Sequence, residues 1–404
     1  MSRKHSENGY HDNYAYQMPK NGGKGTRGGQ FEDVSSYSSS KGKGGKKKST
    51  TRRVVSILLA VVFSLCIVAG AALIYVSTYL LGDLNTTSLT KNKAELGIAS
   101  DIISSSEIKN IALFGVDSRS EGESARSDSI MILSLDMKHK KVKLTSVARD
   151  SYVPVEGYGY TKITHAYAYG GYQLAVKTLN QNFNMDIMDY VTIDFRGLAS
   201  IIDAIGGVDL NITSEERDEI NRILYMTATD DPSLGLNPYE HLLSDDQYGD
   251  VHMDGYQAVS YARIRYLDSD FGRMDRQQNV MQAMFSQVMA VSKTEYPKMV
   301  RTLAGYCETS MNIGDILPLV QLVLSNFTIE RLSLPSDSIG YSTPTIDGMS
   351  VVQYDLETAA HQLDAFIKEQ DSPYWSDFYS TGGTDEGNDY NNGDGYDENE
   401  TNEW

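Results

Sequence analysis

The sequence predicts an α/β layered domain, and two features of it carry this prediction. Apolar runs of strand length alternate with runs of helical length from about residue 106 to residue 370. The strand-length runs are nearly uninterrupted, as in strands that are buried on both faces. Strands and helices that follow one another in this way pack as helical layers on a central sheet.

Four segments have the composition of buried strands, and five have the length and periodicity of helices. The strands are expected over 110–116, 129–135, 142–147 and 191–195. The helices are expected over 171–183, 197–205, 275–292, 313–326 and 356–369. The segment 215–254 is polar and weakly patterned, so we interpret it as an insertion loop beside the functional site.

One run ahead of this domain predicts a membrane anchor. Residues 54–81 are 28 consecutive residues without a charge. About 20 apolar residues cross a bilayer core as a helix. The run is too long, and too far from the N-terminus, for a cleaved signal peptide. Seven basic residues between 41 and 53 precede it and none follows until Lys91. The positive-inside rule therefore predicts a single-pass protein of the cell membrane, with 1–53 cytoplasmic and 82–404 extracytoplasmic.

The remaining segments are predicted from their composition. Residues 1–53 are rich in Gly, Ser and Lys and are expected to be a disordered basic tail. Residues 82–105 are polar and are expected to form a stalk before the folded domain of 106–370. Residues 371–404 include nine acids from 377 to 403, which is typical of a disordered acidic tail.

The charge of the chain excludes some partners. Residues 1–53 have a net charge of +8, which leaves −26 for everything after them. Such an acidic domain is a poor partner for nucleic acid or an anionic lipid surface. A local basic cluster within it would therefore indicate an anionic substrate. The two cysteines, Cys66 in the apolar run and Cys307 beyond it, exclude a zinc site built on cysteines and leave the outer domain without an internal disulfide.

Two acids flank the loop between the first two strands. Asp117 follows the first strand and Asp128 precedes the second. Ligands of open α/β sheets bind beyond the carboxyl ends of strands. Two carboxylates that meet there suit Mg²⁺, which takes oxygen ligands and substrate phosphates. The alternative is that both acids only cap loops or helices.

Two further groups of polar residues follow strands or precede a helix. Arg149 and Asp150 come directly after the third strand, either as an ion pair or as a phosphate clamp that the Asp orients. Lys162 and His165 precede the pair Gly170-Gly171 and a helix. Backbone N–H groups at a glycine-rich helix start bind anions, although a capped loop with surface aromatic residues would have the same sequence.

The strongest pattern is a concentration of arginines. Arg263 and Arg265 alternate, so on a strand they would share one face. Arg273, Arg276 and Gln277 have the i, i+3, i+4 spacing of one helix face. Arginine makes bidentate contacts with phosphate, so this cluster predicts a phosphate site on an acidic domain.

The helix that carries Arg273 continues with apolar residues on the same stripe. These residues are Met281, Met284 and Val288. They could line a groove for the apolar tail of an amphiphile or belong to the ordinary core.

Taken in order, these segments resemble the LytR-CpsA-Psr family of extracytoplasmic transferases, most clearly from residue 110 to 284. The matching stretches are 115–117, 126–129, 146–150, 162–163, 165–167, 205–208, 254–258, 261–263, 270–273 and 276–278. The resemblance implies a mixed central sheet between helical layers, an α-β-α sandwich, with a long hydrophobic pocket for a lipid. It also implies that 106–370 is the catalytic domain. The length of 215–254 and the acidic tail depart from the family's usual pattern.

The resemblance also implies an activity and its residues. The family transfers teichoic acids or capsular-type polysaccharides from a polyprenyl-pyrophosphate carrier to peptidoglycan. Asp117 and Asp128 would hold Mg²⁺ (or Mn²⁺). The catalytic residues would be Arg149, Asp150, Arg263 and Arg265. The pyrophosphate would bind Arg126, Lys162, Arg273, Arg276 and Gln277. Asp150 could orient Arg149 or deprotonate the acceptor hydroxyl, and we favour orientation.

Two other functions use the same sequence features. The same residues could hydrolyse a polyprenyl pyrophosphate, with water in place of the acceptor. Alternatively, the chain could be a membrane-bound transcriptional regulator or attenuator that binds DNA through the tail 1–53. The basic cluster of this tail lies beside the predicted anchor, where the positive-inside rule explains it, so no nucleic acid is expected as a partner.

Overall fold

The computed structural model describes Tyr75 and residues 85–102, 104–116, 126–267, 270–292 and 294–379, with gaps at 313, 317–318, 320–321, 323–324 and 326. The predicted tail 1–53, nearly all of the apolar run 54–81, and residues 380–404 lie outside these ranges. Within the described ranges, no helix is long and apolar enough to cross a bilayer.

The described residues are built on a seven-stranded mixed sheet. Its order is β1-β10-β7-β2-β3-β4-β11. The strands are β1 (Asn85–Thr86), β2 (Ile108–Val116), β3 (Ser127–Asp136), β4 (Lys141–Val147), β7 (Asp189–Asp194), β10 (Cys307–Thr309) and β11 (Thr328–Leu334). β2, β3 and β4 are antiparallel neighbours, whereas β7 runs parallel to β2 and β11 parallel to β4. The four predicted strands and the mixed sheet are confirmed.

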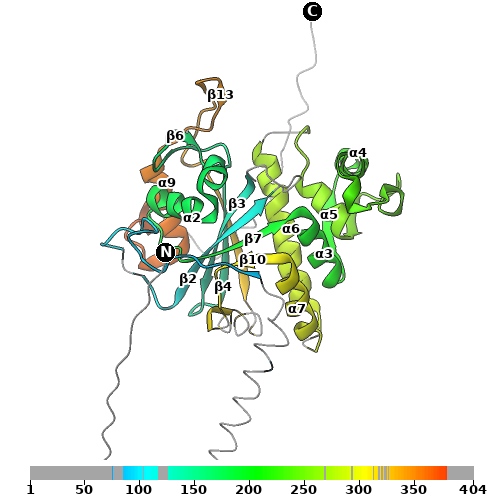
Figure 1. Cartoon of the computed structure of the whole chain (residues 1–404), viewed down its shortest axis with the longest axis horizontal. Helices are drawn as coiled ribbons and strands as arrows, with labels where there is room; N and C mark the ends of the chain where they lie inside the picture. Colours follow the sequence, from blue (N-terminus) through cyan, green and yellow to red (C-terminus); the bar gives the residue numbers. More distant parts are fainter. Residues whose placement is uncertain are drawn as a thin grey trace, which may run out of the picture. The chain divides into compact units, whose positions relative to one another are not determined.

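Helices cover both faces of this sheet (Figure 1). One face packs against α2 (Thr164–Phe183) and α9 (Leu356–Lys368), where Phe114 and Ile132 meet Leu179 and Leu363. The other face packs against α6 (Asp270–Ala290), which contributes Phe285. Beside α6 lie α3 (Phe195–Ala204), α5 (Gly255–Ala262) and α7 (Tyr296–Tyr306). The predicted layers are confirmed, and the helix expected over 313–326 falls largely outside the described residues.

The smaller elements form hairpins around the sheet. β5 (Tyr152–Val155) pairs with β6 (Gly159–Lys162), β8 (Val208–Ile212) with β9 (Gly249–Met253), and β12 (Thr345–Ile346) with β13 (Met349–Ser350). Near the end of the described chain, the short helices η4 (Glu369–Asp371) and α10 (Trp375–Phe378) follow α9.

Two predicted domain boundaries are wrong. The segment 82–105 is not a stalk where it is described, because β1 joins the sheet and Leu89, Leu96 and Ile98 are buried in the core. Its polar residues also find partners in the domain, since Lys91 Nζ lies 2.6 Å from Asp189 Oδ1. At the other end, residues 371–379 are not part of a disordered tail, because α10 packs on α9.

The predicted insertion loop over 215–254 is also wrong for most of its length. It contains α4 (Ser214–Asp230) and β9. Thr213 and Glu216 form a capping box that starts α4, and Ile220 and Leu224 are fully buried. Only the stretch between Asp230 and Gly249 lacks longer elements, with the short turns η2 (Pro232–Leu234) and η3 (Pro238–Glu240).

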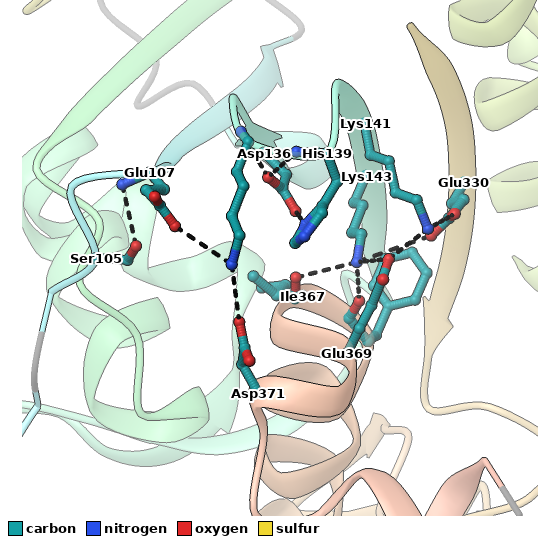
Figure 2. Close-up of polar contacts among 12 residues, drawn as sticks. Ser105, Glu107, Asp136, His139, Lys141, Lys143, Glu330, Ile367, Glu369 and Asp371 are labelled. Carbon is teal, nitrogen blue, oxygen red and sulfur yellow. Dashed lines mark hydrogen bonds and ion pairs between the residues drawn. The ribbon is translucent and has the colours of Figure 1, made fainter. Parts of the chain in front are cut away.

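A buried lysine joins the sheet to the end of α9 (Figure 2). Lys143 of β4 is fully buried, and its Nζ donates to the carbonyl oxygens of Phe366 (2.6 Å) and Ile367 (3.0 Å) and to Glu369 Oε1 (2.7 Å). The last carbonyl groups of a helix have no hydrogen-bond donor within the helix, and a cation beside them is also stabilised by the negative end of the helix dipole. Lys143 therefore fixes the last turn of α9 to β4, next to the edge strand β11.

We expect the substitution Lys143→Met to destabilise the domain by about 3 kcal/mol, because it leaves two carbonyls and one carboxylate without their donor. Denaturant unfolding followed by circular dichroism measures this loss. The control is Lys141→Met, which removes a partly exposed lysine that binds the same Glu369. It should cost at most about 1 kcal/mol. Equal losses in both variants would contradict the role given to Lys143.

Candidate functional site: an arginine cluster at the edge of the sheet

The site forms where β3 begins and β4 ends. These strands are antiparallel, so their opposite ends meet at one edge of the sheet. Asp128 lies near the start of β3, and Arg149 and Asp150 follow β4 directly. Arg263 caps the C-terminal end of α5, and Arg273 lies in the first turn of α6. Residues that are more than 100 positions apart in the chain therefore meet at this edge.

Asp128 is the centre of the cluster. Its Oδ1 accepts from Arg149 Nη1 at 2.9 Å, its Oδ2 lies 3.3 Å from Arg265 Nη2, and its backbone carbonyl accepts from Arg273 Nη2 at 3.1 Å. Burial alone would raise the pKa of Asp128, but the guanidinium groups of Arg149 and Arg265 outweigh burial and hold that pKa below its ordinary value. The carboxylate is therefore ionised at neutral pH.

Arg273 is buried with unused hydrogen-bond donors. The residue is 2% exposed, and its Nε and Nη1 donate no hydrogen bond within the described residues. The same holds for Arg149 Nε. Burial, together with repulsion from Arg149 and Arg265, lowers the pKa of Arg273 to about 10. Buried N–H groups that lack acceptors are costly, so an anion would be a suitable partner for these donors.

The nearby acids neutralise this charge only in part. Asp270 Oδ1 lies 3.7 Å from Arg149 Nη2 and 3.8 Å from Arg273 Nη1, beyond hydrogen-bonding distance. Asp150 is engaged by Lys162, whose Nζ lies 2.8 Å from Asp150 Oδ1. Asp150 Oδ2 lies 3.6 Å from Arg149 Nε, so Asp150 bridges Lys162 and Arg149. This position suits a residue that orients Arg149.

The arginines open into a cleft of about 370 Å³. Among the predicted site residues, its lining includes Asp128, Arg263, Arg265, Arg273 and Gln277. The guanidinium carbon of Arg263 lies 4.7 Å from the centre of the Phe195 ring, and its Nη1 donates to Thr227 Oγ1 at 2.7 Å. Stacking on an aromatic face and a side-chain hydrogen bond together fix this guanidinium in the cleft wall.

The predicted strand under Arg263 and Arg265 is wrong. Asp254 and Gln257 form a capping box that starts helix α5, and this helix continues to Ala262. Arg263 and Arg265 follow the helix end and reach the same cleft from an irregular segment.

The glycine pair divides α2 into two helical segments. The backbone angles of Gly170 and Gly171 are not helical, so a second helical segment begins after them, as predicted. Anion binding at this second helix start stays a prediction.

Three predicted residues lie apart from the polar contacts that connect Asp128, Arg149, Asp150 and Lys162 or outside the described chain. Arg276 is buried, and its Nε donates to Glu216 Oε1 of α4 at 2.7 Å. It does not line the cleft. Arg126 is exposed and close enough to His165 to help burial lower the pKa of that imidazole. Asp117 lies outside the described residues, so its predicted meeting with Asp128 stays a prediction.

One part of the cleft wall was missed from sequence. It is lined by Arg222, Ile223 and Met226 of α4. Arg222 and Met226 have the i, i+4 spacing of one helix face. The missed feature was the capping box of Thr213 and Glu216, which marks α4 as a helix and so brings Arg222 to the site.

Residues 73–368 match the LytR_cpsA_psr family. A teichoic acid transferase of Enterococcus faecalis, polyisoprenyl-teichoic acid–peptidoglycan teichoic acid transferase TagU, is 26% identical over 314 residues, which are 74% of this chain and 96% of that protein. The structure of TagT bound to LIIa-WTA superposes with a TM-score of 0.55 at 22% identity, over 70% of this chain and 99% of TagT.

A structure of the LytR-CPS2A-psr family protein YwtF (TagT) with bound octaprenyl pyrophosphate lipid has a TM-score of 0.51 at 21% identity, with 70% of this chain and 99% of that chain covered. At these identities, the two structures show a shared fold. Because the family match spans most of the sequence and the central sheet, we conclude that this chain belongs to the LytR-CpsA-Psr family.

Proposed function

We propose that this chain transfers an anionic glycopolymer, of teichoic acid or capsular type, from a polyprenyl-pyrophosphate carrier to peptidoglycan. The observation that carries the proposal is a set of buried donor atoms, Arg149 Nε and Arg273 Nε and Nη1, for which no described residue provides an acceptor. They lie beside an open cleft in a strongly acidic chain. The names of the relatives, which include TagU teichoic acid transferases and TagT with octaprenyl pyrophosphate, support the same substrate class.

The arginines supply most of the chemistry that the chain itself provides. Arg149, Arg265 and Arg273 would bind the pyrophosphate oxygens and stabilise the negative charge that builds on them as the carrier leaves. Because these side chains are held by Asp128 before the substrate arrives, little reorganisation is needed during the reaction. The acceptor hydroxyl oxygen forms the new bond to the transferred group and gives up its proton to solvent, while the bond to the carrier breaks and its electron pair leaves on the carrier's phosphate oxygen.

The carboxylate of Asp128 is suited to be one of the ligands of a divalent cation. Its carboxylate is ionised and faces the cleft, and Mg²⁺ typically takes one or two carboxylates together with substrate phosphates. Within the described residues, no group of three or more Asp, Glu, His or Cys side chains gathers as a metal site. We propose that Asp128 and Asp117 hold Mg²⁺ (or Mn²⁺), which when bound would neutralise charge on the pyrophosphate.

The polyprenyl tail would lie between the sheet and α6. Leu113, Leu133 and Val191 on this face of the sheet are only partly buried, as is Phe285 of α6 that packs with them. Interior faces of a layered domain are normally closed by packing, so incomplete burial here leaves apolar surface for a lipid chain. Met284 and Val288 pack against the cluster of α3, α4 and α5, as expected for core residues.

We propose that the chain acts at the outer face of the cell membrane. The uncharged run 54–81 and the basic residues before it support an anchor with the catalytic domain outside. Peptidoglycan, which the relatives' names give as the acceptor, lies on this side of the membrane.

A reconstituted reaction tests the proposal. The full chain is incubated with a polyprenyl-pyrophosphate-linked glycan and uncrosslinked peptidoglycan strands, and the products are identified by mass spectrometry. We expect glycopolymer attached to the strands. The phosphate count of the released lipid then distinguishes phosphoryl transfer, which leaves polyprenyl phosphate, from cleavage at the sugar carbon, which leaves the pyrophosphate. Free glycan without attachment would indicate the alternative hydrolase.

The substitution Arg263→Ala should reduce transfer by about 100-fold or more. It removes a guanidinium group that stacks on Phe195 and donates to Thr227 in the wall of the cleft. Product formation per enzyme is measured beside a melting curve that checks folding. Arg196→Ala, at an exposed arginine of α3, is the control and should keep full activity. Full activity in the Arg263 variant would remove this residue from the site.

Arg273→Met and Arg276→Met should affect stability differently, although both residues are buried on α6. Arg273 has unused donors and like-charged neighbours, so its replacement should leave the melting temperature unchanged or raise it while transfer falls about 100-fold or more. Arg276 neutralises the largely buried Glu216, so its loss should cost about 3 kcal/mol. Destabilisation by Arg273→Met would show that the cluster is complete without an anion.

Removal of divalent cations with a chelator should abolish transfer and leave the fold intact, and added Mg²⁺ should restore it. In Asp128→Asn, restoration should require a higher Mg²⁺ concentration, because an amide is a weaker ligand than a carboxylate. Transfer rate against Mg²⁺ concentration provides the comparison. Undiminished transfer in the presence of the chelator would exclude the metal.

A further inference from the structure

The ring of Phe271 lies next to two arginines of the site. Phe271 is in the first turn of α6, two residues before Arg273. It lines a cavity of about 10 Å³ that Arg149 and Arg273 line as well. A cavity of this size holds about one water molecule at most, so the side chains around it are close together. The ring of Phe271 also packs on the ring of Tyr341, with ring centres 4.4 Å apart and planes 32° apart.

The loop that carries Tyr341 connects β11 to α9 and is fixed on both sides of this residue. Before it, Ser336 Oγ donates to Gln362 Oε1 of α9 at 2.8 Å. After it, Ser342 and Gln353 exchange two backbone hydrogen bonds of 2.9 and 2.8 Å. Tyr341 itself is 45% exposed, so these fixed points, and not burial alone, determine where its ring lies.

The end of this loop is joined to the segment that carries Arg149. The backbone N–H of Val352 donates to the carbonyl oxygen of Asp150, and the N–H of Tyr152 donates to the carbonyl oxygen of Val352, both at 2.8 Å. Val352 is 5% exposed and lines the same small cavity. Backbone hydrogen bonds therefore connect the loop to the chain on both sides of Asp150, directly after Arg149.

Arg149 and Arg273 need such a connection because their charges repel each other. Asp128 binds both side chains, and Asp270 lies 3.7 Å from Arg149 Nη2 and 3.8 Å from Arg273 Nη1. These contacts hold the guanidinium groups, but the backbones that carry them belong to different elements. Side chains hold a ligand in a precise geometry only when packing behind them locks their positions. The contact between Phe271 and Tyr341 supplies such packing between α6 and the segment after β4.

We propose that Tyr341 is a positioning residue of the pyrophosphate site, which sets the spacing between Arg149 and Arg273 by packing on Phe271. This inference rests on the proposed function, because it takes these arginines as the groups that bind the pyrophosphate. Neither Tyr341 nor Phe271 lines the arginine cleft. The effect of Tyr341 on the ligand therefore passes through Phe271 and the arginines, and not through a contact of its own.

The test is the binding of farnesyl pyrophosphate with Mg²⁺ to the full chain in detergent micelles, measured by isothermal titration calorimetry. We expect Tyr341→Ala to bind about tenfold more weakly, which corresponds to about 1.4 kcal/mol. Tyr341→Phe keeps the ring and should bind like the unchanged chain. Phe271→Ala should lose at least as much affinity as Tyr341→Ala. The double Ala variant should bind no more weakly than Phe271→Ala alone, because Tyr341 then has no ring to act through.

The matched control is Tyr158→Ala. Tyr158 is 54% exposed and stacks on Tyr169 with ring centres 4.3 Å apart, so this variant also removes one half-exposed ring from an aromatic pair. Neither residue of this pair lines the arginine cleft, and the variant should bind like the unchanged chain. Melting curves check that each variant is folded, and Tyr341→Ala should melt close to Tyr158→Ala.

Four results would overturn the inference. The first is unchanged affinity in Tyr341→Ala, and the second is an equal loss in Tyr341→Phe, which would assign the effect to the hydroxyl group. The third is an additive loss in the double variant, which would mean that Tyr341 reaches the ligand by itself. The fourth is no binding by the unchanged chain. The expected pattern of affinities without any glycopolymer transfer would instead contradict the proposed function and leave this inference standing.

Discussion

The site depends on one electrostatic arrangement, in which a single carboxylate holds several guanidinium groups that repel one another. Asp128 contacts Arg149 and Arg265 through its two side-chain oxygens and Arg273 through its backbone carbonyl. Without this anchor, like charges at such short range would separate towards solvent. With it, the arginines stay in place, and several of their buried donors have no acceptor among the residues that the structure describes. The cluster is therefore organised before the ligand arrives, which is the condition for strong electrostatic stabilisation of a leaving group.

The rest of the fold supports this edge of the sheet from two sides. On one side, the β5–β6 hairpin brings Lys162 next to Asp150. On the other side, α3, α4 and α5 form the cleft wall that fixes Arg263 against Phe195. Figure 1 shows these groups of elements on opposite sides of the sheet, with β6 on one and α4 on the other. Lys143 lies near the start of β4 and holds the end of α9 (Figure 2), whereas Arg149 follows the other end of that strand. Stability and ligand binding are therefore assigned to different ends of the same strands.

Much of the site could be predicted because its residue types are rare in their surroundings. Arg149, Arg263, Arg265 and Arg273 stand out in a chain of net charge −18, and all four meet at the edge of the sheet. Arg276 has the same spacing on the helix, but it faces Glu216 of α4 and not the cleft. Helical spacing places Arg273, Arg276 and Gln277 on one side of α6 but does not tell which neighbour each will meet. Arg222 was missed because the helix that carries it was interpreted as a loop.

The sequence by itself determined the strands β2, β3, β4 and β7, the layered α/β class, the resemblance to the family and the acidic character of the domain. These properties follow from local apolar patterns and composition, which do not depend on distant contacts. Only the tertiary structure decided that residues 85–102 belong to the sheet and core, that α5 ends at Arg263, and that Lys162, Asp150 and Arg149 form one chain of contacts. These outcomes depend on which segments pack together, and packing energy overrides weak local preference in polar segments.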